Sequence, residues 1–138
     1  EFLLDEKHLH EIAAKYVKEV NIKVSNIENP VSSLSGGNQQ KVVLAKWLNT
    51  DNQIYIFDEP TKGIDVGAKS EIYSIINQLA LQGKTILIVS SEIPELLGIC
   101  DRIHVFHEGK INGEIAVSDY RNNKDEAQEL IMKYATAN

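Results

Sequence analysis

Residues 54–89, IYIFDEPTKGIDVGAKSEIYSIINQLALQGKTILIV, contain two apolar runs separated by a stretch with helical spacing. The run IYIF, residues 54–57, is apolar without alternation, which is typical of a parallel strand covered on both faces. Over residues 67–81 the apolar positions keep helical spacing, and Gly83 ends this predicted helix. TILIV, residues 85–89, is the second apolar run. Strand, helix and strand in this order predict a right-handed βαβ unit, and therefore an α/β domain.

The chain before this unit is predicted to form two helices. Residues 5–20 carry apolar side chains at helical spacing, with acidic residues at the start, where the helix dipole is positive. A second helix is expected over residues 37–48. Its inner side is expected to carry Val43, Leu44, Trp47 and Leu48.

The chain after residue 89 is predicted to contain two helices and a hairpin. Residues 92–99 indicate a short helix with Pro94 in its first turn. Residues 102–115 read as a hairpin that turns at Glu108 and Gly109. Residues 122–135 favour a closing helix with acidic residues near its start.

Composition excludes several classes of protein. The net charge of −6 and the pI of about 5.2 disfavour a nucleic-acid binder, which needs a basic face. The single cysteine, Cys100, excludes internal disulfides and is expected to act as a small apolar residue. No run approaches the roughly 20 apolar residues of a membrane-spanning helix, and no signal-peptide pattern opens the chain. The four histidines lack the spacing of a metal site.

Polar residues follow each apolar run. Asp58 and Glu59 come after residues 54–57, and Ser90 and Ser91 come after residues 85–89. Ligands of open α/β sheets bind beyond the carboxyl ends of the strands, so these positions are candidates for a site. A carboxylate pair at a buried strand end favours Mg²⁺ with a nucleotide phosphate. The alternative is a strand end that reaches solvent, with Glu59 simply exposed.

A second candidate is LSGGNQQ, residues 34–40, at the start of the predicted second helix. It offers a hydroxyl, two glycine amides without side chains and a helix dipole, which together suit an anion. The alternative is an ordinary helix cap, in which Ser33 or Ser35 accepts a hydrogen bond from a free amide.

Three stretches resemble motifs of the ATP-binding-cassette (ABC) ATPases. LSGGNQQ resembles the signature motif, IYIFDEP resembles the Walker B strand, and TKGIDVGAK resembles the D-loop. Ser35 and Asp58 stand 23 positions apart (58 − 35), the separation usual for the family. The amino-acid sequence of these stretches is similar to that of the second cassette of tandem sugar-importer ATPases of the ribose, galactose and xylose type.

The resemblance implies a P-loop NTPase fold of the α/β class, with a mostly parallel sheet, helices on both faces, and a C-terminal β-hairpin and helix. The P-loop itself, G-x-x-x-x-G-K-[ST], does not occur in these residues. The chain is therefore expected to be the C-terminal part of a cassette. By the resemblance, residues 1–50 end the helical subdomain and include the signature helix, and residues 51–138 form the C-terminal part of the ATPase core.

The resemblance also implies roles for particular residues, with ATP and Mg²⁺ as cofactors. At the chain's own site, Asp58 would hold Mg²⁺ through water, and Glu59 would orient or deprotonate the attacking water. Asp65 would lie on the D-loop at the seam between two cassettes. The residues that would face the γ-phosphate of a partner cassette's ATP, or lie beside it, are Ser35, Gly36, Gly37, Asn38 and Gln39.

One position departs from the common family pattern. Ten positions before Asp101, where the family has its switch histidine, this sequence has Ser91. A serine cannot carry the positive charge of an imidazolium or reach as far toward the γ-phosphate. We expect the chain's own site to bind ATP and hydrolyse it slowly. By itself, Ser91 is equally compatible with capping the helix over residues 92–99.

As a member of such an importer, the protein would power sugar uptake at the cytoplasmic face of the inner or plasma membrane. Its partners would be the transmembrane permease subunits, a partner cassette and, indirectly, a periplasmic sugar-binding protein, with no nucleic acid. The isolated 138-residue chain is expected to lack ATPase activity and to self-associate through exposed strand edges. The alternatives are a soluble ABC ATPase outside transport and a non-catalytic interaction module.

Overall fold

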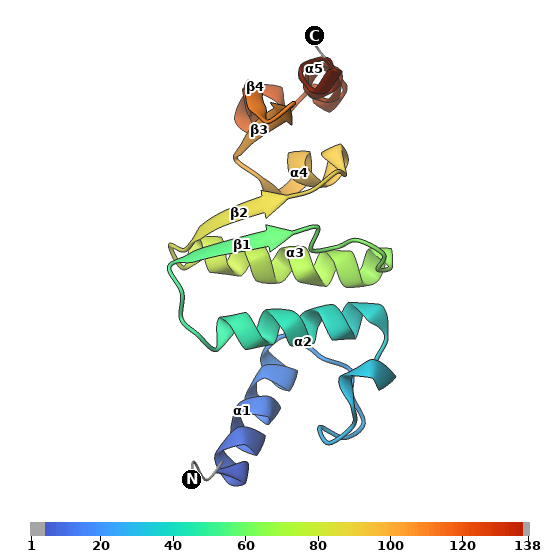
Figure 1. The fold of residues 1–138 in the computed structure, drawn as a ribbon, viewed down its shortest axis with the longest axis vertical. Coiled ribbons are helices and arrows are strands. Elements are labelled where there is room, and N and C mark those ends of the chain that lie inside the picture. The colour runs from blue at the N-terminus through green and yellow to red at the C-terminus, as the bar shows by residue number, and fades with distance from the viewer. Residues whose placement is uncertain (1–4, 137–138) are drawn as a thin grey trace. The chain divides into compact units, whose positions relative to one another are not determined.

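The computed structural model describes residues 5–136. The chain divides into two units, Glu1–Leu87 and Ile88–Asn138, which are described separately below. The elements in chain order (Figure 1) are α1 (Glu6–Glu19), η1 (Val31–Ser33), α2 (Gly36–Leu48), β1 (Ile54–Asp58), α3 (Val66–Leu81), β2 (Thr85–Val89), α4 (Ile93–Ile99), β3 (Arg102–His107), β4 (Lys110–Ala116), η2 (Val117–Tyr120) and α5 (Lys124–Thr136). The predicted division at residue 50 stays a prediction, and its outer ends, residues 1–4 and 137–138, lie outside the described residues.

The predicted strand, helix and strand are found as β1, α3 and β2. The two strands pair in one sheet and run in the same direction (Figure 1), and the backbone N–H of Thr85 donates to the carbonyl of Gln53 at 2.9 Å. Gly83 has a φ of +82°, a conformation that glycine adopts without steric cost, at the end of α3. The α/β class with parallel strands is confirmed.

Burial of β1 differs from the expectation of two covered faces. Tyr55 and Phe57 are buried, whereas Ile54 and Ile56 are 63% and 67% exposed. The strand therefore alternates between a buried and an open side, because no described element of the first unit covers the second side. A continuous apolar run does not by itself say which elements supply the cover.

The inner face of α2 also differs from the prediction. Val43 and Trp47, expected in the core, are 47% and 57% exposed. The face that α2 buries consists of Gly37, Lys41, Leu44 and Ala45. This face follows helical spacing from Gly37, and it is selected by the packing of α2 against both α1 and α3.

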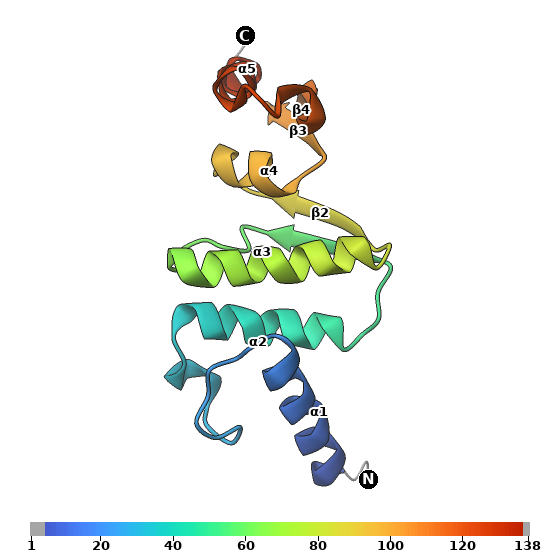
Figure 2. The same ribbon diagram turned by 180° about the vertical axis from the view of Figure 1, so that it is seen from behind.

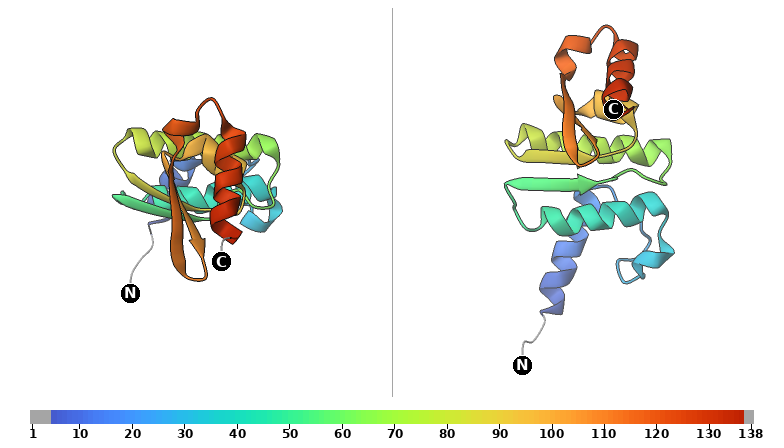
Figure 3. Two further views of the ribbon diagram at one scale, coloured as in Figure 1. Left: turned by 90° about the horizontal axis from the view of Figure 1, so that it is seen from above. Right: turned by 45° about the horizontal axis from the view of Figure 1, so that its top comes forward.

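The second unit consists of a hairpin, two helices and a short 3₁₀ turn. Strands β3 and β4 are antiparallel, and the turn between them has positive φ at Glu108 and Gly109, as a two-residue type I′ turn requires. Helix α5 lies beside the hairpin (Figure 3). The core of the unit comprises Leu97, Ile103, Val105, Ile115, Ala127 and Ile131. The predicted hairpin and C-terminal helix are thereby confirmed.

Among the described residues, no helix combines the length and the apolar character that crossing a membrane requires.

Candidate functional site

Three predicted motifs meet at one end of the first unit. Helices α2 and α3 begin there and strand β1 ends there, as Figure 1 and the opposite view in Figure 2 both show. The stretches that resemble the signature motif, the Walker B strand end and the D-loop are separated in sequence but share one edge of this unit. The sequence predicted each motif separately. The fold brings together the starts of α2 and α3 and the end of β1, where the motifs lie.

Ser35 and Gly36 form the exposed start of α2. Ser35 occupies the N-cap position, with extended φ and ψ of −61° and 155°, but its side chain makes no capping hydrogen bond to the helix. The hydroxyl of Ser33 donates instead to the carbonyl of Pro30 at 2.7 Å. Neither serine therefore acts as the ordinary side-chain cap that was the alternative interpretation. Amides of the first helical turn have no partner within their own helix.

Gly37 has a different role from its neighbour. It is buried, and a Cβ built on it would lie 2.5 Å from the Cβ of Ala68 on α3. The corresponding Cβ on Gly36 would lie 3.9 Å from its nearest neighbour, on Ile64, which is an ordinary contact. Gly37 thus lacks a side chain because two helices approach closely there, whereas Gly36 is the glycine whose backbone is exposed.

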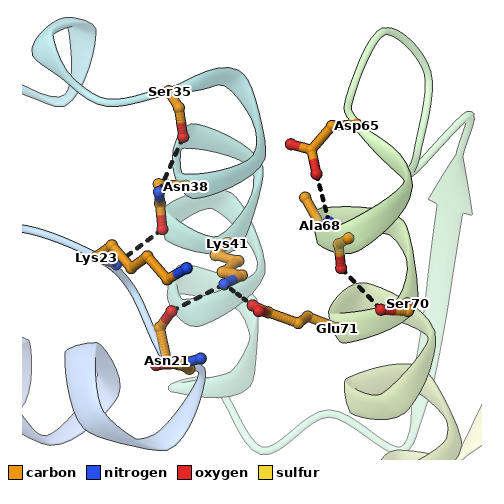
Figure 4. A network of polar contacts seen from close by, with 10 residues as sticks. Asn21, Lys23, Ser35, Asn38, Lys41, Asp65, Ala68, Ser70 and Glu71 are labelled. Atoms are coloured by element: carbon orange, nitrogen blue, oxygen red, sulfur yellow. Dashed lines mark hydrogen bonds and ion pairs between the residues drawn. The ribbon is translucent and has the colours of Figure 1, made fainter.

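The side chains of Asn38 and Gln39 are engaged within the protein. Asn38 accepts from the backbone N–H of Lys23 at 2.8 Å and donates to the Ser35 hydroxyl oxygen at 2.9 Å (Figure 4). Gln39 donates through Nε2 to the carbonyl of Leu34 at 2.8 Å, which holds the turn before α2. Both residues therefore shape the start of α2.

Asp65 is the N-cap of α3. Its Oδ1 accepts from the backbone N–H of Ala68 at 3.0 Å, and its Oδ2 would lie 3.9 Å from a Cβ on Gly37. Asp65, the predicted D-loop acid, is therefore next to α2, the predicted signature helix. The loop between β1 and α3 is anchored at buried Thr61, whose hydroxyl oxygen accepts from Tyr73 of α3 at 3.1 Å.

Asp58 and Glu59 lie at the carboxyl end of β1. Asp58 is exposed and Glu59 is half-buried, so the strand end reaches solvent at Asp58, but Glu59 is not simply exposed as the alternative interpretation expected. Glu59 has a φ of +46°, in the left-handed region. Such a conformation in a non-glycine residue costs on the order of 1–3 kcal/mol and is concentrated at functional sites. Two hard carboxylate donors fit Mg²⁺, although the described residues contain no cluster of three or more metal-ligating side chains.

Ser91 belongs to the second unit and is exposed. The N-cap position of α4 is occupied by Glu92, whose backbone N–H donates to the hydroxyl oxygen of Ser90 at 3.0 Å.

Cys100, at the end of α4, is half-buried, and its burial, with Asp101 adding to the effect, raises the pKa of its thiol. The thiol is consequently kept in its unreactive protonated form.

Sequence reasoning missed a polar link between α2 and α3. Lys41 is only 3% exposed, and its Nζ donates to the carbonyl of Asn21 at 2.8 Å and pairs with Glu71 of α3 (Figure 4). The available signal was a lysine four positions after Gly37, on the same helical face. This position was not recognised because the predicted apolar face was centred on Val43 and Trp47.

Known proteins resemble the chain in sequence. Residues 4–62 match the family model described as ABC transporter. The ribose import ATP-binding protein RbsA of Clostridium perfringens strain SM101 is 53% identical over 96% of this chain and 25% of its own length. The xylose import ATP-binding protein XylG of Thermoanaerobacter pseudethanolicus is 55% identical over 90% of this chain and 23% of its own length.

Solved structures share the fold. The dimeric structure of MJ0796, titled a bacterial ABC transporter cassette, superposes with a TM-score of 0.71 at 22% identity, over 85% of this chain and 50% of that one. The cassette MJ1267 gives a TM-score of 0.77 at 21% identity, over 97% and 52%. The chain thus spans about a quarter of the length of the curated relatives and about half of these cassettes.

Proposed function

We propose that this chain belongs to the family of ABC transporter ATP-binding proteins, and that the protein containing it is the ATPase subunit of a sugar importer. The names of its relatives, which include ribose and xylose import ATP-binding proteins, support sugar as the cargo. Permease subunits and a periplasmic sugar-binding protein would then be its partners, at the cytoplasmic face of the membrane. The net charge of −6 argues against the alternative of an ABC ATPase that acts on nucleic acid.

The observation that carries the proposal is the exposed start of α2. Ser35 and Gly36 are exposed there, and Asp65 lies beside Gly37 in the first turn of the same helix. We propose that the Ser35 hydroxyl and the first amides of α2 receive the γ-phosphate of an ATP held by a partner cassette, where they stabilise the charge that develops during phosphoryl transfer. Dimeric cassettes of the same fold support a partner of this kind.

A second set of residues serves the chain's own nucleotide. Asp58 would hold Mg²⁺ through water, and the metal would neutralise charge on the nucleotide phosphates. Glu59 would orient or deprotonate the attacking water from its fixed backbone position. We propose that this site is slow, because Ser91 cannot supply the charge of an imidazolium. The isolated chain is expected to have no ATPase activity, since its residues contain no phosphate-binding loop.

The two roles are separated by two substitutions in the full-length protein assembled with its permease. Ser35→Ala is expected to lower ATP turnover by about 10²–10³-fold, because it removes a donor from the competent site. Glu59→Gln is expected to leave turnover within about 3-fold, because it affects a site that is already slow. Steady-state phosphate release measures both. Loss of turnover in Glu59→Gln together with full turnover in Ser35→Ala would assign the competent site to this cassette and overturn the proposal.

Slow hydrolysis at the chain's own site is tested by Ser91→His. Restoring an imidazole is expected to raise single-turnover hydrolysis at this site by about 10-fold or more. The matched control is Ser90→His, which adds the same side chain one position away. Equal rates in the original protein and in Ser91→His would show that the serine does not limit the site.

A further inference from the structure

The side chain of Asn38 joins the start of α2 to the segment that follows α1. Its Oδ1 accepts from the backbone N–H of Lys23 at 2.8 Å, and its Nδ2 donates to the Oγ of Ser35 at 2.9 Å (Figure 4). The residue before Lys23, Ile22, is buried in the apolar cluster of α1 and α2, and its N–H bonds to the carbonyl of Val17 at 2.8 Å. The donor at Lys23 is therefore held in place by packed structure.

The direction of both hydrogen bonds follows from this fixed donor. A backbone N–H can only donate, so the oxygen of the Asn38 amide must face Lys23. The nitrogen of the amide, which can only donate, must then face Ser35. The Ser35 hydroxyl oxygen is consequently the acceptor in this bond, and its own proton is not used there.

That proton is available for a partner outside the chain. Ser35 is exposed and makes no capping bond to α2, and within residues 5–136 its hydroxyl has Asn38 as its hydrogen-bond partner. An ionised phosphate oxygen can accept a hydrogen bond but has no proton with which to donate one. The Ser35 hydroxyl already accepts a hydrogen bond from the Asn38 amide, and its proton is therefore left to donate to such an acceptor.

We propose that Asn38 is a positioning residue that directs the Ser35 hydroxyl proton outward, toward the phosphate oxygen received at the start of α2. The inference rests on the function proposed above and adds the residue that sets the polarity of its hydroxyl donor. Asn38 acts through Ser35.

The test reverses the hydrogen bond in the full-length protein assembled with its permease. In Asn38→Asp one oxygen still accepts from Lys23, and the other turns an acceptor toward Ser35, which then donates its proton inward. Turnover, as kcat, is expected to fall by about 10–10²-fold. In the Ser35→Ala background the same substitution is expected to change kcat by less than about 3-fold, because the hydroxyl on which it acts is gone.

This double-mutant cycle separates positioning from charge and from folding. A carboxylate that merely repels phosphate, or that loosens the turn, would lower kcat equally in both backgrounds, and that result would overturn the inference. Asn49→Asp makes the same substitution at the exposed C-terminal end of α2, outside residues 34–40, and is expected to leave kcat within about 3-fold. An unaffected kcat in Ser35→Ala itself would instead overturn the proposed function, so the two failures are distinguishable.

The 138-residue chain provides a readout that needs no ATP. In ¹⁵N NMR spectra the side-chain amide of Asn38 is expected to show slowed proton exchange, and Ser35→Ala is expected to speed that exchange by removing the acceptor. An exchange rate that Ser35→Ala leaves unchanged would contradict the hydrogen-bond polarity on which the inference depends.

Discussion

Single glycines in the signature stretch serve different ends. Gly36 leaves the backbone at the start of α2 exposed, and Gly37 lets α2 approach α3 at Ala68. Substitution at Gly37 therefore tests helix packing, while substitution at Gly36 leaves that packing intact. The difference was not visible in the sequence, where the two residues are adjacent and identical.

Gly37→Ala is expected to destabilise the chain by about 1–3 kcal/mol, because its Cβ would overlap that of Ala68. The midpoint of urea unfolding measures the change. Gly36→Ala is the matched control and is expected to leave the midpoint almost unchanged. The double variant Gly37→Ala with Ala68→Gly should recover most of the loss, and a loss that persists in it would locate the effect elsewhere.

At the scale of elements, α2 and α3 are joined by packing and by charge. Gly37 and Ala68 bring the helices together near their starts, and Lys41 pairs with Glu71 one turn farther along (Figure 4). Through these contacts the helix of the signature stretch and the helix that Asp65 caps form one packed pair. The start of α2 is thereby held in a fixed position relative to the D-loop.

Removing one member of the Lys41–Glu71 ion pair is expected to lower the free energy of unfolding more than replacing both members does. Glu71→Ala leaves the buried ammonium of Lys41 with only the Asn21 carbonyl, at a cost of about 1–3 kcal/mol, since Glu71 is itself partly exposed. The double variant Lys41→Met with Glu71→Leu should recover most of that stability in urea unfolding. Additive losses in the double variant would contradict this account.

The contrasting pair is Lys84 and Asp51, in which Lys84 Nζ lies 2.7 Å from Asp51 Oδ1 and the side chain of Lys84 is 13% exposed. Asp51 is 89% exposed, and its bond to Lys84 lowers the pKa of its carboxyl group. Because water already solvates this carboxylate, Asp51→Asn, which tolerates the positive φ of +43° at this position, is expected to change the unfolding midpoint less than Glu71→Ala does.

At the scale of the whole chain, the open side of the sheet favours association. Ile54 and Ile56 of β1 and Leu87 of β2 are exposed, on strands whose open side no described element of the first unit covers. Contiguous apolar surface and an unpaired strand edge both invite a second chain. We therefore retain the prediction that the 138-residue chain self-associates.

Ile56→Lys is expected to shift the chain toward monomer, because a lysine on an exposed strand opposes pairing and apolar contact. Light scattering across a concentration series measures the mass. Leu81→Lys, at another exposed apolar position but at the end of α3 and not on a strand, is the control and should leave association unchanged. A monodisperse monomer in the original chain would contradict the prediction.

The sequence by itself determined the order and type of the elements and the positions of the three motifs. It could do so because helical spacing, Gly83 and the turn at Glu108 and Gly109 are local signals that tertiary packing did not override. The family resemblance rested on the same contiguous residues. These elements and motifs could be predicted because each depends on residues within a few positions along the chain.

Tertiary structure alone decided which faces were buried and which polar atoms met. Lys41 is buried and Trp47 is exposed because α2 packs against both α1 and α3. Helical spacing is compatible with this buried face but does not select it. Asn38 could be linked to Ser35 and Lys23 only once the turn after α1 lay beside the start of α2. Hydrogen bonds and steric limits between distant residues depend on distances in space, and a linear pattern of residue types contains no such distances.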